Sequence, residues 1–190
     1  MTRHLASTAL LALALTACGG SRASGGSDLT LPKDFDACSV LTFERATAIA
    51  GRPVAGITST LDDAQGRSPL MCPYNAGTIE QPQMVSLELR PAVSPDSASR
   101  RMESARPHLE RIAKTKAQPV EGLGEEAYWI VGLQQMHVRK GSVQVVATVQ
   151  SGDAPLDDAR KLANEAFAAI EKASAEAKKQ QEAAAAGGKS

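Results

Sequence analysis

The stretch that decides the fold runs from residue 120 to residue 150 and reads VEGLGEEAYWIVGLQQMHVRKGSVQVVATVQ. It holds three runs of strand-forming residues separated by glycines, at 127–131, 133–139 and 142–150. In the last run every second residue from Val143 to Val149 is aliphatic, an alternation typical of a half-buried antiparallel strand. Gly141 supplies the left-handed backbone that a tight hairpin requires. We therefore predict a three-stranded meander at the centre of the domain.

Length and composition limit the class of protein. The chain has 190 residues, of which 43% are hydrophobic and only 3% aromatic, so there is room for one domain with an aliphatic core. Twenty-one basic and 21 acidic residues leave no net charge. Without a basic run in the folded part, nucleic acid has no electrostatic footprint to bind.

Two helices and two strands are expected before the meander, with a further short strand at 57–61. The strands are predicted at 71–75 and 83–90, and the helices begin after the N-caps Thr42 and Ser94. Pro107 lies inside the second helical pattern, so we expect a kink or break near residues 104–106. A third helix follows Pro155. The order αβββ-αβββ-α predicts an α+β, two-layer domain in which helices cover an antiparallel sheet.

The N-terminus reads as an export signal over residues 1–17, where a short polar start precedes an apolar run. That run is shorter than the ~20 residues that span a bilayer. It ends in LTAC at residues 15–18, which resembles the lipobox of bacterial lipoproteins. The resemblance implies that a diacylglycerol is attached to Cys18 after cleavage before it, which would anchor the protein. The alternative is an ordinary cleaved signal with an incidental cysteine.

Three further segments follow the signal. Residues 18–33 are expected to hold the lipidated Cys18 and a flexible Gly/Ser tether, 34–172 a single α+β domain, and 173–190 a polar Ala/Lys/Gln-rich tail. Gly19 after the cysteine resembles lipoproteins that are passed to the outer membrane. The expected location is therefore the cell envelope, on the periplasmic side of the outer membrane if there are two membranes.

Two cysteines remain once Cys18 is lipidated. Cys38 and Cys72 form an even pair in an exported chain, so we predict a disulfide that closes 34 residues. The alternative is two separate buried thiols. A metal site is not expected, because the sequence has no CxxC pair and no histidine close to these cysteines.

Chemistry-bearing motifs are scarce. GxSxG, HExxH, P-loop and GxGxxG patterns are absent from the sequence, so we expect no enzyme, cofactor or metal. The candidate binding surface is an aromatic pair beside polar sheet residues: Tyr128, Trp129, His137 and Arg139. Alternation places Tyr128 and Trp129 on opposite faces, so at most one ring is expected in the core, and His137 is expected in solvent. The alternative role of the outer ring is to cover a sheet edge.

Four short motifs carry a resemblance to a known group. DACSVLT at 36–42, MCPY at 71–74, GLGEEAYW at 122–129 and HVRKGSVQVVATV at 137–149 resemble small bacterial envelope lipoproteins of uncharacterised function. A looser similarity is to the disulfide-stabilised extracellular sensor domain of a mycobacterial receptor Ser/Thr kinase. The resemblance implies the fold and the disulfide, and it brings no catalytic residues. We expect a non-enzymatic, lipid-anchored envelope protein that binds a protein partner or small ligand. The alternatives are a structural accessory lipoprotein and a hydrolase.

Overall fold

The computed structural model describes residues 29–56 and 68–187. Within them the helices and strands confirm the α+β class, while the strand expected at 57–61 and the predicted lipobox lie outside the described residues. In chain order the elements are η1 (Ala37–Ser39), α1 (Phe43–Ala50), β1 (Ala55–Gly56), β2 (Met71–Asn75), β3 (Met84–Pro91), α3 (Pro95–Ala113), β4 (Gln118–Pro119), β5 (Glu126–Ile130), η2 (Val131–Leu133), β6 (Gln135–Lys140), β7 (Val143–Val149) and α4 (Pro155–Gly187).

The strands form one antiparallel sheet in the order β1-β2-β3-β7-β6-β5-β4. Two meanders, β1 to β3 and β4 to β7, meet at its centre where β3 pairs with β7, with Leu87 opposite Ala147. The predicted hairpin between β6 and β7 is present, and Gly141 in its turn has φ 56°. β4 was not predicted, because its two residues, one of them Pro119, are too few to show an alternation.

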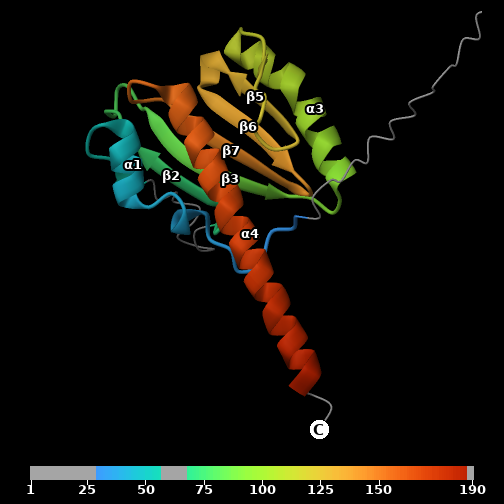
Figure 1. The fold of residues 1–190 in the computed structure, drawn as a ribbon. Coiled ribbons are helices and arrows are strands. Elements are labelled where there is room, and N and C mark those ends of the chain that lie inside the picture. Colours follow the sequence, from blue (N-terminus) through green and yellow to red (C-terminus); the bar gives the residue numbers. More distant parts are fainter. Residues whose placement is uncertain (1–28, 57–67, 188–190) are drawn as a thin grey trace, which may run out of the picture.

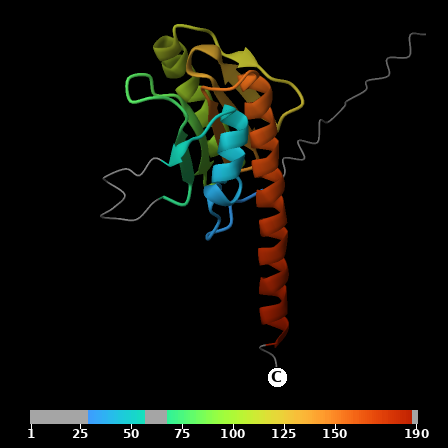
Figure 2. The same ribbon diagram turned by 90° about the vertical axis from the view of Figure 1, so that its left-hand side faces the viewer.

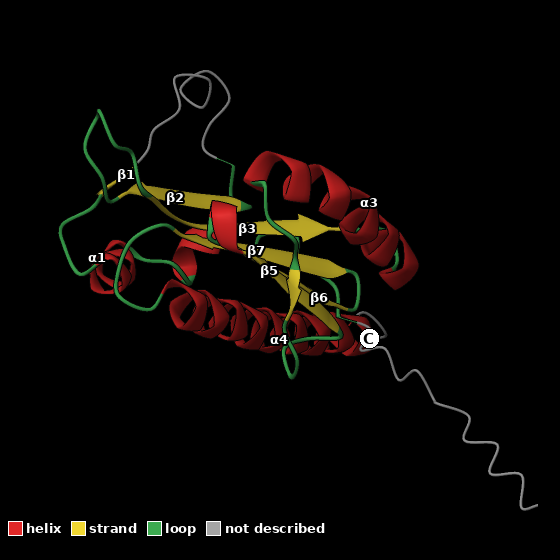
Figure 3. Ribbon diagram, turned by 90° about the horizontal axis from the view of Figure 1, so that it is seen from above, coloured by secondary structure: helices red, strands yellow, loops and turns green. Residues whose placement is uncertain are grey.

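Helices cover both faces of the sheet. Seen from above in Figure 3, α1 and α4 lie on one face and α3 lies on the other. The predicted cover of an antiparallel sheet by helices is confirmed, and α3 adds a third, partial layer. As a result all seven residues of β7 are buried, where the alternation had predicted a half-buried strand. Polar residues such as Gln144 face α3 instead of solvent.

The main core lies between the sheet and the helices α1 and α4. It is aliphatic as predicted, with Val145 and Ala147 of β7 opposite Leu162 and Ile170 of α4. A smaller cluster under α3 consists of Met102, Tyr128 and Ile130. The two faces of the sheet thus differ. The face covered by α1 and α4 packs in an aliphatic core, and the face covered by α3 is largely polar.

The helix boundaries follow the predicted capping residues. The Thr42 side chain accepts a hydrogen bond from the Arg45 amide, and Gly51 ends α1 with φ 66°. Ser94 and Ser97 cap α3 reciprocally. The break expected before Pro107 is wrong, since α3 runs without interruption from Pro95 to Ala113. Pro107 lies on the exposed side of the helix, where water can satisfy the carbonyl that lost its backbone donor.

The predicted disulfide between Cys38 and Cys72 is present, with a Cα–Cα distance of 5.1 Å. It joins η1 to β2, and Cys72 is buried in the main core. The bond therefore fixes the segment before α1 to the sheet.

Residues 29–36, here called the strap, belong to the folded domain, so the tether predicted to end at residue 33 is wrong over 29–33. Leu29 is only 7% exposed, and its carbonyl accepts hydrogen bonds from the Ser142 amide and hydroxyl at 3.1 and 2.9 Å. The Thr30 carbonyl accepts one from the Ser174 hydroxyl at 2.9 Å. Leu31 packs against the main core. The strap therefore connects the hairpin turn to α4.

The last helix continues well past the sheet. α4 has 33 residues and ends at Gly187, so most of the segment predicted as a polar tail is helical. Figures 1 and 2 show its final turns extending beyond the strap, away from the rest of the domain. Among the described helices, α4 included, none combines the length and apolar character needed to cross a membrane.

Candidate functional site

The predicted binding surface is buried. Tyr128 and Trp129 point to opposite faces, as alternation required, yet both are covered: Trp129 in the main core and Tyr128 under α3. Their exposed fractions are 5% and 2%, and His137 is 1% exposed. The side chain of Arg139 retains 12% exposure and is engaged in ion pairs. The expectations of an exposed ring and of a solvated histidine are therefore wrong, because α3 covers this face.

Beneath α3, Tyr128 and His137 form a stacked pair. Their ring centroids are 4.9 Å apart at an interplanar angle of 16°, and the Arg106 guanidinium lies 4.9 Å from the Tyr128 centroid. The Tyr128 hydroxyl donates to the Met102 carbonyl at 3.4 Å, and the Gln144 amide nitrogen lies 3.4 Å from His137 Nδ1. Burial raises the pKa of Tyr128 to about 12. Burial, helped by the field of a nearby arginine, lowers the pKa of His137 to about 3.

Ion pairs surround this stack. Arg106 of α3 pairs with Glu126 at 2.8 Å, and Arg139 contacts Glu125 at 2.5 Å and Glu126 at 3.6 Å. Each of the two adjacent glutamates is therefore paired with an arginine, and neither side chain is more than 27% exposed. Since His137 and Tyr128 are almost inaccessible, a substrate cannot contact them. We conclude that this cluster fastens α3 to the sheet.

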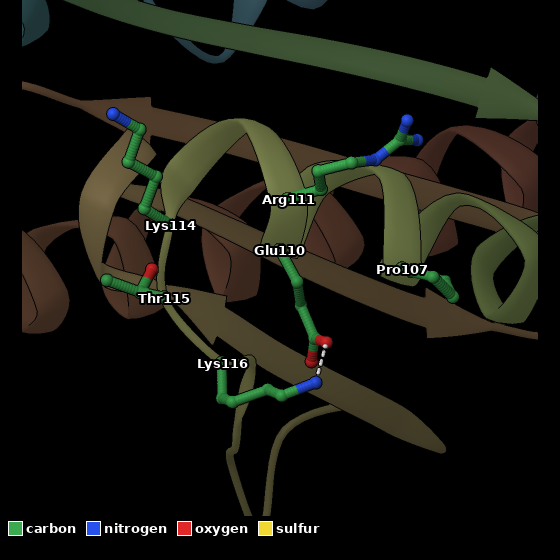
Figure 4. A pocket seen from close by; sticks show the side chains of 6 residues that line it. All are labelled: Pro107, Glu110, Arg111, Lys114, Thr115 and Lys116. Atoms are coloured by element: carbon green, nitrogen blue, oxygen red, sulfur yellow. Dashed lines mark hydrogen bonds and ion pairs between the residues drawn. The ribbon is translucent and has the colours of Figure 1, made fainter.

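A small pocket of about 310 Å³ lies at the C-terminal end of α3. Three of its lining residues are basic, namely Arg111, Lys114 and Lys116, which would suit an anion. Lys116, however, is paired with Glu110 at 2.8 Å, and Figure 4 shows Arg111 and Lys114 pointing away from that pair. A helix C-terminus also carries negative partial charge, which disfavours an anion. The cations do not converge, so this pocket is a poor site.

The larger depression is a groove of about 1230 Å³ between the strap and α4. Residues 30–36 and Ser39 form one wall, and residues of α4 between 169 and 181 form the other. Leu31, Phe35, Ala173 and Ala177 contribute apolar surface to the lining. Its charged residues balance, three basic against three acidic: Lys33, Lys172, Lys178, Asp34, Asp36 and Glu176.

The groove is large for a compact ligand. Small-molecule pockets usually measure about 300–1,000 Å³ and are mostly apolar with few polar groups. An open lining with balanced charges suits a polypeptide segment better. We therefore take the strap–α4 groove as the candidate binding site.

This groove was not predicted from the sequence. The weak signals were the two leucines of the LTLP motif inside a Gly/Ser-rich stretch, and alanines spaced by four at 169, 173 and 177. No cluster of three metal-ligating side chains occurs in the ranges 29–56 and 68–187. These ranges therefore offer no basis for proposing a metal centre.

Comparisons with known proteins found no relative to guide the assignment. No protein-family model matches the chain, no curated protein matches it significantly, and no solved structure matches it significantly. The function therefore has to be inferred from the residues and geometry of this chain.

Proposed function

We propose that this chain is a lipid-anchored protein of the bacterial cell envelope that binds a partner and carries out no catalysis. The LTAC motif ending at Cys18, preceded by an apolar run, supports the anchor. The Cys38–Cys72 disulfide supports an exported protein, because such bonds persist in oxidising compartments. The resemblance of the DACSVLT and GLGEEAYW motifs to envelope lipoproteins points the same way. In a bacterium with two membranes, the domain would face the periplasm from the outer membrane.

The strap–α4 groove is the observation that carries the binding role. It is open, it combines apolar and charged lining, and its volume of about 1230 Å³ exceeds that of a usual small-molecule pocket. Of the two partner classes expected from the sequence, the groove favours a segment of another protein over a small ligand. The buried cluster around His137 is unsuited to either, because α3 already occupies that face.

The anchor is tested by metabolic labelling in the producing bacterium. A clickable palmitate analogue should label the wild-type protein, and Cys18→Ala should carry none and leave the membrane fraction. Equal labelling of both proteins would contradict the anchor.

The groove is tested by site-specific photocrosslinking in the same cells. A photoreactive residue at Ala177, which lines the groove, should give a discrete protein adduct. The matched control is Ala175, two residues away on the same helix but exposed and outside the groove lining. The same adducts from both positions, or none from Ala177, would argue against the groove as the binding site.

A further inference from the structure

The attachment of α3 to the sheet includes little apolar burial. Of its 19 residues, all described, only Ala98 and Met102 are buried. Among the described residues, the main core contains none from α3, because that core lies on the other face of the sheet with α1 and α4 (Figure 3). The apolar cluster that α3 forms around Met102 is small. Since apolar burial is the dominant stabilising term in folding, α3 can leave the sheet at a lower cost than unfolding of the whole domain.

Polar contacts supply much of the remaining attachment of α3. Arg106 pairs with Glu126 at 2.8 Å, and the Arg101 guanidinium donates to the last two carbonyls of β3 at 2.7 and 3.0 Å. This interface is imperfect: within the described residues, Nε of Arg101, Nε of Arg106 and Oε1 of Gln144 are buried without hydrogen-bond partners. Such atoms destabilise the closed arrangement, and water can satisfy them once α3 moves away.

His137 lies beneath α3 among neighbours that suit a neutral ring. It stands in β6 opposite Tyr128 of β5 and Val146 of β7, and only 1% of it is exposed. Its ring stacks on Tyr128 with the centroids 4.9 Å apart. The Gln144 amide nitrogen donates to Nδ1 at 3.4 Å, so Nε2 carries the proton and donates to Gln135 Oε1 at 3.4 Å. A second proton, on Nδ1, would point at the amide donor of Gln144.

The charged groups around this ring do not compensate a second proton. Those that face it from β3, the β5 region, β6 and α3 are four arginines and three glutamates: Arg90, Arg101, Arg106, Arg139, Glu88, Glu125 and Glu126. Each glutamate is already paired with an arginine, and β7 contributes the neutral Gln144. The field at the ring is therefore positive. Burial first, and then the Arg90 charge, lower the pKa of His137 to about 3.

We propose that α3 is an acid-sensitive cover: protonation of His137 releases α3 from the sheet while the sheet, α1 and α4 stay folded. This inference goes beyond the proposed function and does not depend on the lipid anchor. Opening would bring the stacked rings of Tyr128 and His137, together with the arginines of this face, into contact with solvent. Acid would thereby expose a polar and aromatic surface that is closed at neutral pH.

Linkage between protonation and opening gives the size of the effect. With α3 closed the pKa of His137 is about 3, whereas a ring in contact with water titrates near the ordinary value of 6.5. Because closure lowers the pKa, the stabilisation of the closed state is complete above about pH 6.5 and is lost as the pH falls toward 3. The fraction of molecules with α3 open should therefore rise by up to about 25-fold between pH 7 and pH 5.

The experiment is hydrogen exchange of the full-length protein at pH 7 and pH 5, with rates corrected for the pH dependence of chemical exchange. Amides of α3 report its opening, and amides of β7, which is wholly buried, report global unfolding. Protection of α3 should be lower than that of β7 at both pH values. A low concentration of denaturant should hardly change it, because a local opening exposes little surface. From pH 7 to pH 5 it should fall by up to about 25-fold in the wild type.

Variants identify the group that responds to acid. His137→Gln cannot titrate and should give equal α3 protection at the two pH values, and His137→Phe is a second non-titrating variant that can still stack on Tyr128. The matched control His108→Gln removes a histidine on the exposed side of α3 and should keep the wild-type fall. Glu126→Gln removes the partner of Arg106, so it should lower α3 protection at both pH values and leave the fall with pH in place.

Three results would overturn the proposal. If α3 is as well protected as β7 at both pH values, the helix leaves only when the whole domain unfolds. A fall of less than about threefold in the wild type, a result that needs no variant, would show that acid does not open α3. A fall that persists unchanged in the His137 variants would assign the acid response to another group.

Discussion

Acid should destabilise this domain through one buried histidine. His137 is 1% exposed beneath α3, and burial lowers its pKa to about 3 from an ordinary value of 6.5. In the unfolded chain the same imidazole takes up a proton near pH 6.5. Because the pKa is lowered by folding, the stabilisation from keeping His137 neutral is complete above about pH 6.5. It is lost progressively as the pH falls toward 3.

The magnitude follows from the two pKa values. One pKa unit corresponds to 1.36 kcal/mol, so the full difference is worth roughly 5 kcal/mol as an order of magnitude. Between pH 7 and pH 5 the unfolded chain gains most of one proton that the folded chain does not bind, which costs about 2 kcal/mol. The facing groups do not offset this loss. The Arg90 charge opposes protonation, and Tyr128 and Gln144 are neutral in this range.

The measurement is denaturant unfolding at pH 7 and pH 5. The free energy of unfolding of the wild type should fall by about 2 kcal/mol more than that of His137→Gln, which cannot titrate. His137→Phe provides a second non-titrating side chain that can still stack on Tyr128. The control His108→Gln removes an exposed histidine and should keep the wild-type pH dependence. If the folded His137 variants lose as much stability between the two pH values as the wild type, the reasoning is refuted.

Two further predictions concern the covalent link and the proline in α3. Cys38→Ala/Cys72→Ala should lower the free energy of unfolding by about 3–4 kcal/mol, since the bond closes a 34-residue separation; two alkylatable thiols in the folded wild type would disprove the bond. Pro107→Ala should raise the free energy of unfolding by about 1–3 kcal/mol, because it restores a backbone donor inside an exposed helix. Pro95→Ala, at the first helical position where proline is tolerated, should bring no such gain in the same denaturation assay.

The framework of the fold could be predicted because its signals are local. In β3, Val85, Leu87 and Leu89 alternate with polar residues, and the strand forms with these three side chains in the main core. The N-caps Thr42 and Ser94 could be predicted for the same reason, because an N-cap side chain bonds to backbone amides within one turn. The disulfide could be predicted from a count of cysteines in a chain that was expected to be exported.

Burial of the polar face could not be predicted from alternation. A polar residue at an alternating position of a strand is usually predicted to face water. Gln144 and His137 both stand at such positions in the sequence. Both are at most 1% exposed, because α3 lies over them and is held in part by an ion pair between residues distant along the chain. Arg106 and Glu126 are 20 positions apart, so no local pattern connects them. The candidate groove escaped prediction for the same reason, because the strap meets α4 through Thr30 and Ser174, which are 144 positions apart.

The way α3 is attached explains why the groove, and not the aromatic face, is the better site. Only Ala98 and Met102 of α3 are fully buried, so much of its attachment is polar, including the Arg101 side chain bound to the carbonyls of Arg90 and Pro91. Within the described residues Arg101 Nε and Gln144 Oε1 are buried without hydrogen-bond partners, which costs stability. Because α3 already covers this face of the sheet, a partner could bind there only if α3 moved away. The strap and α4 are instead joined through the Ser174–Thr30 hydrogen bond and leave an open space between them, so a partner can enter without displacing an element of the fold.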